Sequence, residues 1–421
     1  MALEVVRRVA EEGAYSTIAL SAALERSGLG ERDRRLAADL AYGTLRRLLF
    51  LDRALALASG RAPDALEPEA RALLRLGAYQ LLFTRVPPHA AVAETVALAP
   101  LRFRGLANAV LRRLAADPPR PPAGDDDEAV ALRTGLAPWA VAELRRLLPP
   151  DRVEEAARAL AEPAELCLRV NTCRVAVEEV ERALQQAGHR PRRGRHPSVL
   201  RVDSVAPARL PGYAEGWFTV QDEASVLVGE AVGAGPGDRV LDACAAPGGK
   251  ATHLACLVSP GGLVVAGDVH PRRAALVARA AERLGVRVAV LAQDARRPAV
   301  RGPFDAALVD APCSGLGAAR RRPELLWRPA RERLSQLARL QVAILVVTAD
   351  LVRPGGRLVY AVCTFPRAET EAAARAFLAK RPDFEPAALP GPDGPAPAHR
   401  LWPHVHGTDA MFYAGFRRRP A

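Results

Sequence analysis

Lysine is almost absent from this chain. Lys250 and Lys380 are the only lysines among 59 basic residues, so arginine carries nearly all of the net charge of +12. A guanidinium binds phosphate oxygens in pairs and stacks on bases, which a compact ammonium does not do. Genomic base composition can also exchange lysine for arginine, but it does not create a positive excess. The excess indicates a polyanionic partner.

Long apolar runs are also missing. No run approaches the ~18 residues that span a bilayer, and the first eight residues lack the order of charge and apolar core typical of a signal peptide. Six cysteines without metal-ligand spacing are typical of free thiols in a reducing compartment, and His253 between Cys244 and Cys256 completes no zinc motif. We therefore expect a cytoplasmic monomer with no membrane partner and no metal.

The length of 421 residues indicates two or three domains. Residues 1–115 predict helices throughout, with Leu73, Leu74, Gly77 and Leu81 on one helical face. Residues 117–128 combine four prolines, a glycine and an acidic run, which is typical of a linker. We place a helical domain at residues 1–120.

The rest of the chain mixes strands and helices. Residues 129–225 predict a small α+β connecting region, whose basic loop at 189–196 is either a surface turn or a phosphate contact. From residue 226 to 421, strands alternate with helices, which predicts a parallel, doubly wound sheet. The predicted strands are 239–243, 263–267, 286–291, 304–309 and 357–362, and the predicted helices are 250–257, 272–284 and 330–351. Residues 411–416 predict an antiparallel edge hairpin.

A glycine turn follows the first predicted strand of this last region. It consists of Cys244, Ala245, Ala246, Pro247, Gly248, Gly249 and Lys250. Its small residues would let a ligand approach the backbone before the next helix begins. Pro247 stands where a pyrophosphate would need an N–H donor, so the turn fits neither a Walker loop nor a dinucleotide fingerprint. A nucleoside without phosphates, such as S-adenosylmethionine, fits it better.

Acidic residues follow the neighbouring strands. Asp268 ends the second predicted strand, Asp294 follows the third, and Asp310 ends the fourth. A single aspartate at such a position can be a helix N-cap. A carboxylate after each strand, however, is what a methyltransferase needs to hold a sulfonium, a ribose and an adenine. We expect Asp268 at the ribose hydroxyls and Asp294 at the adenine edge.

Two cysteines stand at the ends of predicted strands near this turn. Cys313 lies in the sequence Asp-Ala-Pro-Cys-Ser-Gly at 310–315, and Cys363 follows the strand 357–362. A thiolate beside a cofactor pocket indicates covalent catalysis on an electrophilic carbon, although a free cysteine is also a common core residue. The residues alone leave open which thiol attacks.

Together these motifs resemble the RsmB/Sun family of ribosomal RNA 5-methylcytosine methyltransferases, within the NOL/NOP/Sun group. The resemblance covers nearly the whole chain, through residues 42–47, 73–80, 107–113, 168–172, 220–225, 321–327 and 406–409. It implies an all-α NusB-like N-terminal domain, a small α+β RNA-binding connecting region, and a C-terminal α/β Rossmann-like domain that uses S-adenosylmethionine.

The resemblance also implies a role for each site residue. Cys363 is then the nucleophile that adds to C6 of a cytidine in small-subunit ribosomal RNA, and Cys313 assists release of the methylated product. Asp310 would hydrogen-bond the N3/N4 edge of the base, and Lys250 would pair with Asp310 or lower the pKa of a thiol. The turn 244–250, Asp268, Asp294 and Asp310 would bind S-adenosylmethionine.

Two short stretches depart from the family pattern. Ala-Met-Phe at 410–412 stands where Gly-Phe-Phe is usual, and Glu-Thr-Glu at 369–371 replaces Glu-Asn-Glu. We expect neither stretch to touch a thiol or the cofactor turn.

Other functions fit parts of the sequence. A DNA cytosine methyltransferase would use Cys313 as its nucleophile, but the second cysteine and the helical domain oppose that alternative. A transfer-RNA 5-methylcytosine enzyme of the same group is a closer rival, disfavoured by the NusB-like domain. A NusB-type RNA-binding or antitermination factor with an inactive methyltransferase domain is opposed by the intact turn and both cysteines.

Overall fold

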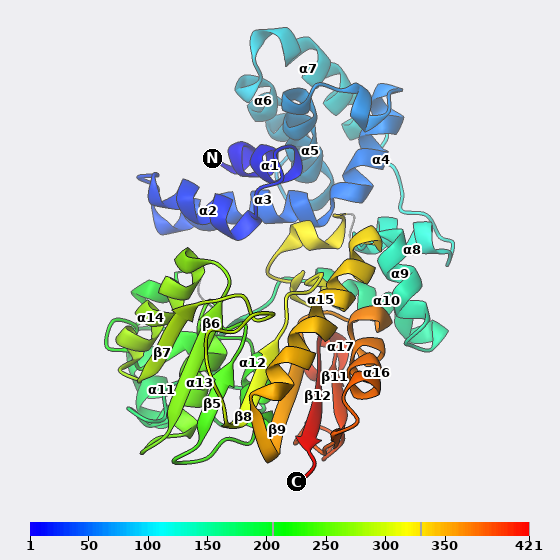
Figure 1. Ribbon diagram of the computed structural model, residues 1–421. Coiled ribbons are helices and arrows are strands. Elements are labelled where there is room, and N and C mark those ends of the chain that lie inside the picture. The colour runs from blue at the N-terminus through cyan, green and yellow to red at the C-terminus, as the bar shows by residue number, and fades with distance from the viewer. Residues whose placement is uncertain (204–205, 329–330, 421) are drawn as a thin grey trace. The chain divides into compact units, whose positions relative to one another are not determined.

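A computed structural model describes residues 1–203, 206–328 and 331–420, and it contains two compact units (Figure 1). The first unit comprises Met1–Pro163 with Ala318–Pro329, and the second comprises Ala164–Gly317 with Ala330–Ala421. The finer division into domains at residues 120 and 225 stays a prediction.

The first unit is helical, as the sequence predicts for residues 1–115. Its apolar core joins Leu51, Leu55, Leu74 and Leu111, and a Cβ on Gly77 would lie only 2.8 Å from Leu111, so α5 and α7 pack closely. Its helices are α1 (Ala2–Ala10), α2 (Ser16–Glu25), α3 (Glu31–Arg46), α4 (Leu48–Ser59), α5 (Pro68–Phe83), α6 (Pro88–Leu98), α7 (Leu101–Ala116), α8 (Asp127–Thr134), α9 (Pro138–Arg145) and α10 (Pro150–Ala161).

The segment 318–328 belongs to this helical unit although it follows the Cys313 loop in sequence. Trp327 donates its indole N–H to the carbonyl of Leu45 (2.9 Å), and Arg46 donates to the carbonyl of Arg320 (2.8 Å). The sequence carries no periodic signal for this packing, because the segment forms only 3₁₀ turns.

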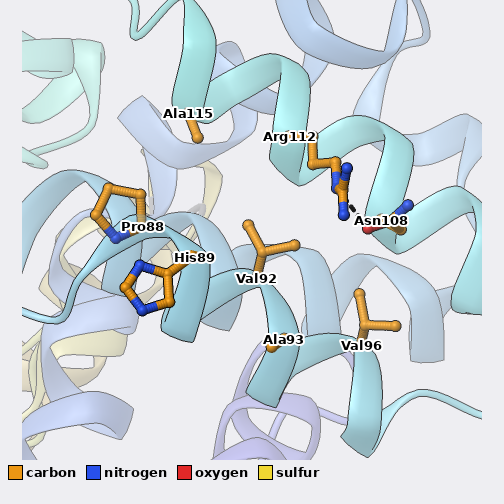
Figure 2. A pocket seen from close by; sticks show the side chains of 8 residues that line it. All are labelled: Pro88, His89, Val92, Ala93, Val96, Asn108, Arg112 and Ala115. Carbon is orange, nitrogen blue, oxygen red and sulfur yellow. Dashed lines mark hydrogen bonds between the residues drawn. The ribbon is translucent and has the colours of Figure 1, made fainter.

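A pocket of about 470 Å³ lies in the helical unit between α6 and α7 (Figure 2). Arg112 donates to the side-chain oxygen of Asn108 (3.0 Å) at its rim, and His89 and Val92 line it from α6. None of the predicted site residues lines this pocket.

The second unit begins with a four-stranded antiparallel sheet in the order β2-β3-β1-β4. Its elements are β1 (Leu166–Val170), α11 (Val177–Gln186), β2 (Arg192–Arg193), β3 (Val199–Val202) and β4 (Phe218–Val220). Arg192 and Arg193 of the predicted basic loop form β2 and pair with carboxylates of the same unit, Glu165 for the first and Glu178 and Glu181 for the second. These pairs favour a surface turn over a phosphate contact.

The larger sheet of the second unit has the order β10-β12-β9-β8-β5-β6-β7, with β11 paired to β12. Strands β5 to β9 are parallel, as predicted. The strands are β5 (Arg239–Asp242), β6 (Leu263–Asp268), β7 (Val288–Ala292), β8 (Phe304–Asp310), β9 (Val352–Val362), β10 (Phe384–Pro386), β11 (Ala398–Leu401) and β12 (Met411–Arg418).

Helices cover both faces of this sheet, so it is doubly wound (Figure 1). Because successive strand residues point to opposite faces, Ala306 and Leu308 of β8 join one core cluster while Ala307 and Val309 join the other. The helices are α12 (Glu223–Ala231), α13 (Gly249–Leu257), α14 (Pro271–Leu284), α15 (Arg331–Asp350), α16 (Glu371–Lys380) and α17 (Pro403–His406).

The expected C-terminal edge hairpin is only partly right. β12 does pair antiparallel with β11, but it also pairs antiparallel with β9, so it lies inside the sheet. Its residues are almost continuously buried, which a strand packed on both faces requires.

The expectation that all six cysteines are free thiols is wrong. Cys173 and Cys256 form a disulfide, which links the chain after β1 to the last turn of α13. The two residues are 83 positions apart, and the fold brings their Cα atoms to 5.8 Å. Sequence spacing carries no sign of such a pairing.

Candidate active site

The predicted site residues gather at one edge of the large sheet. Asp268 and Asp310 are the last residues of β6 and β8, and Cys363 directly follows β9. Asp242, which is not one of the predicted site residues, ends β5 at the same edge. Parallel strands bring their carboxyl ends to the same edge, and the order of the sheet reverses between β5 and β8. Such a switch point is where open α/β sheets form a ligand crevice.

The glycine turn is shaped by close backbone contacts. Gly248 has φ +110°, a conformation that side chains other than glycine rarely adopt, and its Cβ would lie 3.0 Å from the Cα of Val277. Gly249 begins α13, and a Cβ there would lie 3.4 Å from the side chain of Gln221. The conformation of the turn therefore requires glycine at 248, whereas a Cβ at 249 would meet Gln221 at an ordinary contact distance.

Two polar residues near the turn were not among the predicted site residues. Gln221 is buried, and neither polar atom of its side chain has a hydrogen-bond partner within the described chain. Its signal in the sequence is the Val-Gln-Asp motif at 220–222. The other residue is Asp242.

Asp242 is fully buried at the end of β5. Among the described residues, neither of its carboxylate oxygens has a partner in standard hydrogen-bond geometry. Burial is the main cause that raises the pKa of Asp242 to about 7; Asp310 adds to the shift, while Lys250 and, less, the backbone N–H of Cys244 oppose it. A buried acceptor without donors is costly unless a ligand supplies them.

Asp268 and Asp294 hold local partners. The carboxylate of Asp268 accepts the backbone N–H of His270 (3.0 Å) and lies 3.5 Å from the guanidinium of Arg273. Asp294 accepts both the backbone N–H and the guanidinium of Arg296, which lower the pKa of Asp294 to about 2. Both carboxylates lie at the edge as predicted, and their role towards a cofactor stays a prediction.

Lys250 and Asp310 form an ion pair of 2.7 Å. Lys250 Nζ also donates to Ser225 Oγ at 3.3 Å. Burial opposes a charged ammonium, but the carboxylate of Asp310 prevails and raises the pKa of Lys250. Of the two partners that the sequence offered for Lys250, Asp310 makes the direct contact.

The two cysteines of the site face one another. Their sulfur atoms are 3.5 Å apart, and both side chains are partly exposed. A hydrogen bond from Cys313 is the main cause that lowers the pKa of Cys363, with Lys250 adding to it, while burial, Asp310 and Asp409 oppose the shift. The same contact, burial and the charge of Glu369 raise the pKa of Cys313 well above its ordinary value. The pair therefore favours a thiolate on Cys363 and a thiol on Cys313.

Cys244 is the third free cysteine at this edge. Burial, followed by the negative charge of Asp242, raises the pKa of the Cys244 thiol far above its ordinary value. A thiol that stays protonated is a poor nucleophile, so Cys244 is disfavoured as an attacking thiol.

The two stretches that depart from the family pattern lie beside the cysteine loops, and hydrogen bonds tie them to Ser314 and Gly317, not to a thiol or to the turn 244–250. Glu369 accepts the backbone N–H of Ser314 (2.9 Å), the neighbour of Cys313. Ala410 donates its N–H to the carbonyl of Gly317 (3.1 Å), whose own N–H donates to the carbonyl of Cys363 (3.0 Å). Long-range contacts of this kind leave no trace in sequence spacing.

Gly317 offers a test of this loop packing. A Cβ at this position would lie 1.8 Å from the carbonyl oxygen of Ala410 and 3.0 Å from the backbone of Cys363. We expect Gly317→Ala to lower the free energy of unfolding by roughly 1–3 kcal/mol, the usual cost of overpacking. Urea denaturation measures it. Gly235→Ala is the matched control, since a Cβ there meets nothing nearer than 4.0 Å; equal stability of the two variants would contradict the packing argument.

Within the described residues, no group of three or more histidine, cysteine, aspartate or glutamate side chains could hold a metal ion. Across the same residues, no helix has both the length and the apolar character needed to cross a bilayer.

Family comparisons cover each part of the chain. The family model for 16S rRNA methyltransferase RsmB/F matches residues 231–417. The NusB family matches residues 1–116, and the ferredoxin-like domain of RsmF/B-like methyltransferases matches residues 137–209.

Curated relatives match along their whole length. A putative methyltransferase of Mycobacterium tuberculosis is 38% identical, over 99% of this chain and 95% of the relative. The probable ribosomal RNA small subunit methyltransferase B of Bacillus subtilis is 32% identical, over 100% of this chain and 98% of the relative. The ribosomal RNA small subunit methyltransferase B of Klebsiella pneumoniae is 33% identical, over 100% and 97%.

Solved structures agree with the fold. The crystal structure of a protein designated PH0851 superposes with a TM-score of 0.87 at 28% identity, over 99% of this chain and 97% of that one. A methyltransferase homologue from Pyrococcus horikoshii superposes with a TM-score of 0.61 at 26% identity, over 70% of this chain and 99% of its own.

Proposed function

This chain belongs to the RsmB/F family of 16S rRNA methyltransferases, and from that premise we propose that it methylates C5 of a cytidine in small-subunit ribosomal RNA through a covalent Cys363–C6 adduct. The observation that carries the proposal is the pair of facing sulfur atoms, 3.5 Å apart, at the carboxyl ends of β8 and β9. One thiol is needed to attack C6 and a second group to remove the C5 proton.

The residues present fit S-adenosylmethionine. The glycine turn 244–250 lets a ligand approach the start of α13, and the unpartnered carboxylate of Asp242 can accept hydrogen bonds from an ammonium. Asp268 would hold the ribose hydroxyls and Asp294 the adenine edge, as the strand order suggests. When bound, this cofactor supplies the methyl group.

The proposed chemistry assigns one step to each thiol. The Cys363 thiolate forms a bond to C6, and the electrons of the C5=C6 bond make C5 nucleophilic enough to accept the methyl group. Once Cys363 is bound to C6, its negative charge no longer raises the pKa of Cys313, and Cys313 releases its proton to solvent. As a thiolate, Cys313 then takes the C5 proton, the C5=C6 bond re-forms, and the Cys363–C6 bond breaks to free the Cys363 thiolate. Cys363 thus ends as a thiolate and Cys313 as a thiol, as they began, and one proton has gone to solvent.

Asp310 and Lys250 prepare the base for attack. Asp310 would hydrogen-bond the N3/N4 edge of the cytosine, which stabilises the charge that develops as the adduct forms. Lys250 keeps this carboxylate in place through the 2.7 Å ion pair. A target base must leave its stack to reach these groups.

The choice of ribosomal RNA rests on the relatives and on charge. The curated relatives from Bacillus subtilis and Klebsiella pneumoniae are named for the small subunit. A NusB-family helical unit and a net charge of +12 suit a large polyanion.

Methyl transfer to defined RNAs tests the proposal. We expect the protein to transfer tritiated methyl groups from S-adenosylmethionine to 16S ribosomal RNA, and bisulfite sequencing to find one or a few protected cytidines that disappear when the gene is deleted. Transfer only to transfer RNA would support the rival enzyme of the same group. If the folded protein transfers methyl groups to no RNA, the remaining alternative is a NusB-type RNA-binding factor whose methyltransferase domain is inactive.

A further inference from the structure

The carboxylate of Glu369 binds the residue that follows Cys313. Glu369 is fully buried, and it accepts the Ser314 hydroxyl (2.5 Å) in addition to the Ser314 backbone N–H (2.9 Å). The side-chain amide of Gln341 donates to the same carboxylate at 3.0 Å. Burial raises the pKa of Glu369, and the hydrogen bonds from the Ser314 hydroxyl, the Ser314 N–H and Gln341 oppose that shift by stabilising the charged carboxylate.

This network joins the residues that follow the two cysteines. Ser314 follows Cys313, Thr364 follows Cys363, and the hydroxyls of Ser314 and Thr364 are 2.7 Å apart. Because an ionised carboxylate only accepts hydrogen bonds, the Ser314 proton points to Glu369, and Thr364 must donate to Ser314. One carboxylate thus orders both loops.

Glu369 lies on the Cys313 side of this network, since it bonds Ser314 directly and reaches Thr364 through the Ser314 hydroxyl. Besides Cys363 itself, the negative groups that act on Cys313 are Glu369 and Asp310, and both raise the pKa of Cys313. The pKa of Cys363 is lowered by the hydrogen bond with Cys313 and by Lys250, and it is raised by burial, Asp310 and Asp409. A negative charge on the Cys313 side and a cation on the Cys363 side separate two chemically identical thiols.

We propose that Glu369 is a positioning residue that locks the two cysteine loops together and, through its negative charge, keeps the proton on Cys313, so that Cys363 is the thiol that attacks. The inference rests on the proposed function, in which Cys363 attacks C6 and Cys313 assists. Glu369 touches neither sulfur by hydrogen bond and works through Ser314.

Glu369→Gln removes the negative charge of the side chain and keeps its size and shape. The amide can keep its oxygen towards the Ser314 N–H and Gln341 while its NH₂ donates to the Ser314 hydroxyl, which then turns its proton to Thr364. The loops keep their positions and lose only the negative charge. Glu369→Asp keeps the charge on a shorter side chain.

The experiment is pulse alkylation of the full-length protein with iodoacetamide, without RNA or cofactor, read for each cysteine by mass spectrometry across a pH series. In the parent protein we expect Cys363 to react faster than Cys313. In Glu369→Gln we expect the midpoint pH for Cys313 to fall by about one unit, and the Cys363-to-Cys313 rate ratio to fall about tenfold. Glu369→Asp should restore the ratio to within about threefold of the parent value.

Glu371→Gln is the matched control. Glu371 lies two residues away and pairs with Arg400 (2.6 Å) and Thr370 (2.7 Å), and its change should leave the rate ratio unaltered. An unchanged ratio in Glu369→Gln, or the same change in Glu371→Gln, overturns the inference, provided that melting temperatures show folded variants. An unchanged ratio with normal cytidine methylation by the parent protein defeats this inference alone, whereas a parent protein that methylates no cytidine defeats the proposed function.

Discussion

Replacing Cys363 with alanine is expected to abolish the covalent adduct between this protein and RNA that carries 5-fluorocytidine, and to lower methyl transfer by at least about a thousandfold. Fluorine at C5 replaces the proton that Cys313 would remove, so the parent protein should stop at the adduct. The adduct appears as a shifted protein band on a denaturing gel. The physical reason is that, of the two cysteines in the described site, Cys363 has the ammonium of Lys250 to stabilise its thiolate, in addition to the thiol of Cys313.

Cys313→Ala should have the opposite effect on the adduct. Without a base for the C5 proton, the adduct should accumulate with ordinary RNA, and turnover should fall while the shifted band grows. Cys167→Ala is the control, because Cys167 is buried against Val199 and Val226, outside the site. An adduct that survives in Cys363→Ala and vanishes in Cys313→Ala would reverse the assignment, as the DNA-methyltransferase pattern requires.

Asp242→Asn should stabilise the protein without cofactor and weaken cofactor binding. The pKa of Asp242 rises from an unfolded value of 3.8 to about 7 on folding. Between these values the unfolded chain releases a proton that the folded chain keeps, so the stability of the parent falls as pH rises from about 4 to 7 and then levels off. An asparagine does not ionise, so the free energy of unfolding of the variant does not fall in this way as pH rises. We expect the variant to exceed the parent by about 1–4 kcal/mol at pH 8, and by less at pH 5.

Urea denaturation at pH 5 and pH 8 measures this difference, and calorimetric titration with S-adenosylmethionine should show affinity lowered by about tenfold or more. An amide presents one acceptor where the carboxylate presents two. Asp305→Asn is the matched control at the opposite end of β8, where the Arg239 N–H and Arg353 lower the pKa of Asp305. That variant should lose stability at pH 8. A destabilised Asp242→Asn, or one equally stable at both pH values, would contradict the argument.

Much of the site was predictable because its residues stand at the ends of predicted parallel strands. Asp268, Asp310 and Cys363 each stand at or just after a strand of period-two or continuous apolar character, and parallel strands end at one edge. Knowing that the strands are parallel is therefore enough to bring these residues together. The same logic misplaced β12, because a buried strand at the chain terminus looks the same whether it lies at the edge or inside the sheet.

Contacts across long sequence separations were not predictable. The disulfide joins Cys173 to Cys256, and the Glu369 carboxylate meets Ser314 from 55 residues away. The segment 318–328 follows the Cys313 loop in sequence but packs with the helical unit. No local propensity records these pairings, since each depends on how separate elements meet after they fold.

The sequence by itself determined the family, the layered α/β fold and the presence of two cysteines beside a phosphate-free glycine turn, because these follow from local periodicity, motif chemistry and strand order. Only the tertiary structure decided that the sulfur atoms lie 3.5 Å apart, that Lys250 pairs with Asp310, and that Glu369 stands on the Cys313 side. Distance and burial set the pKa of each thiol, and neither quantity exists until the chain is folded.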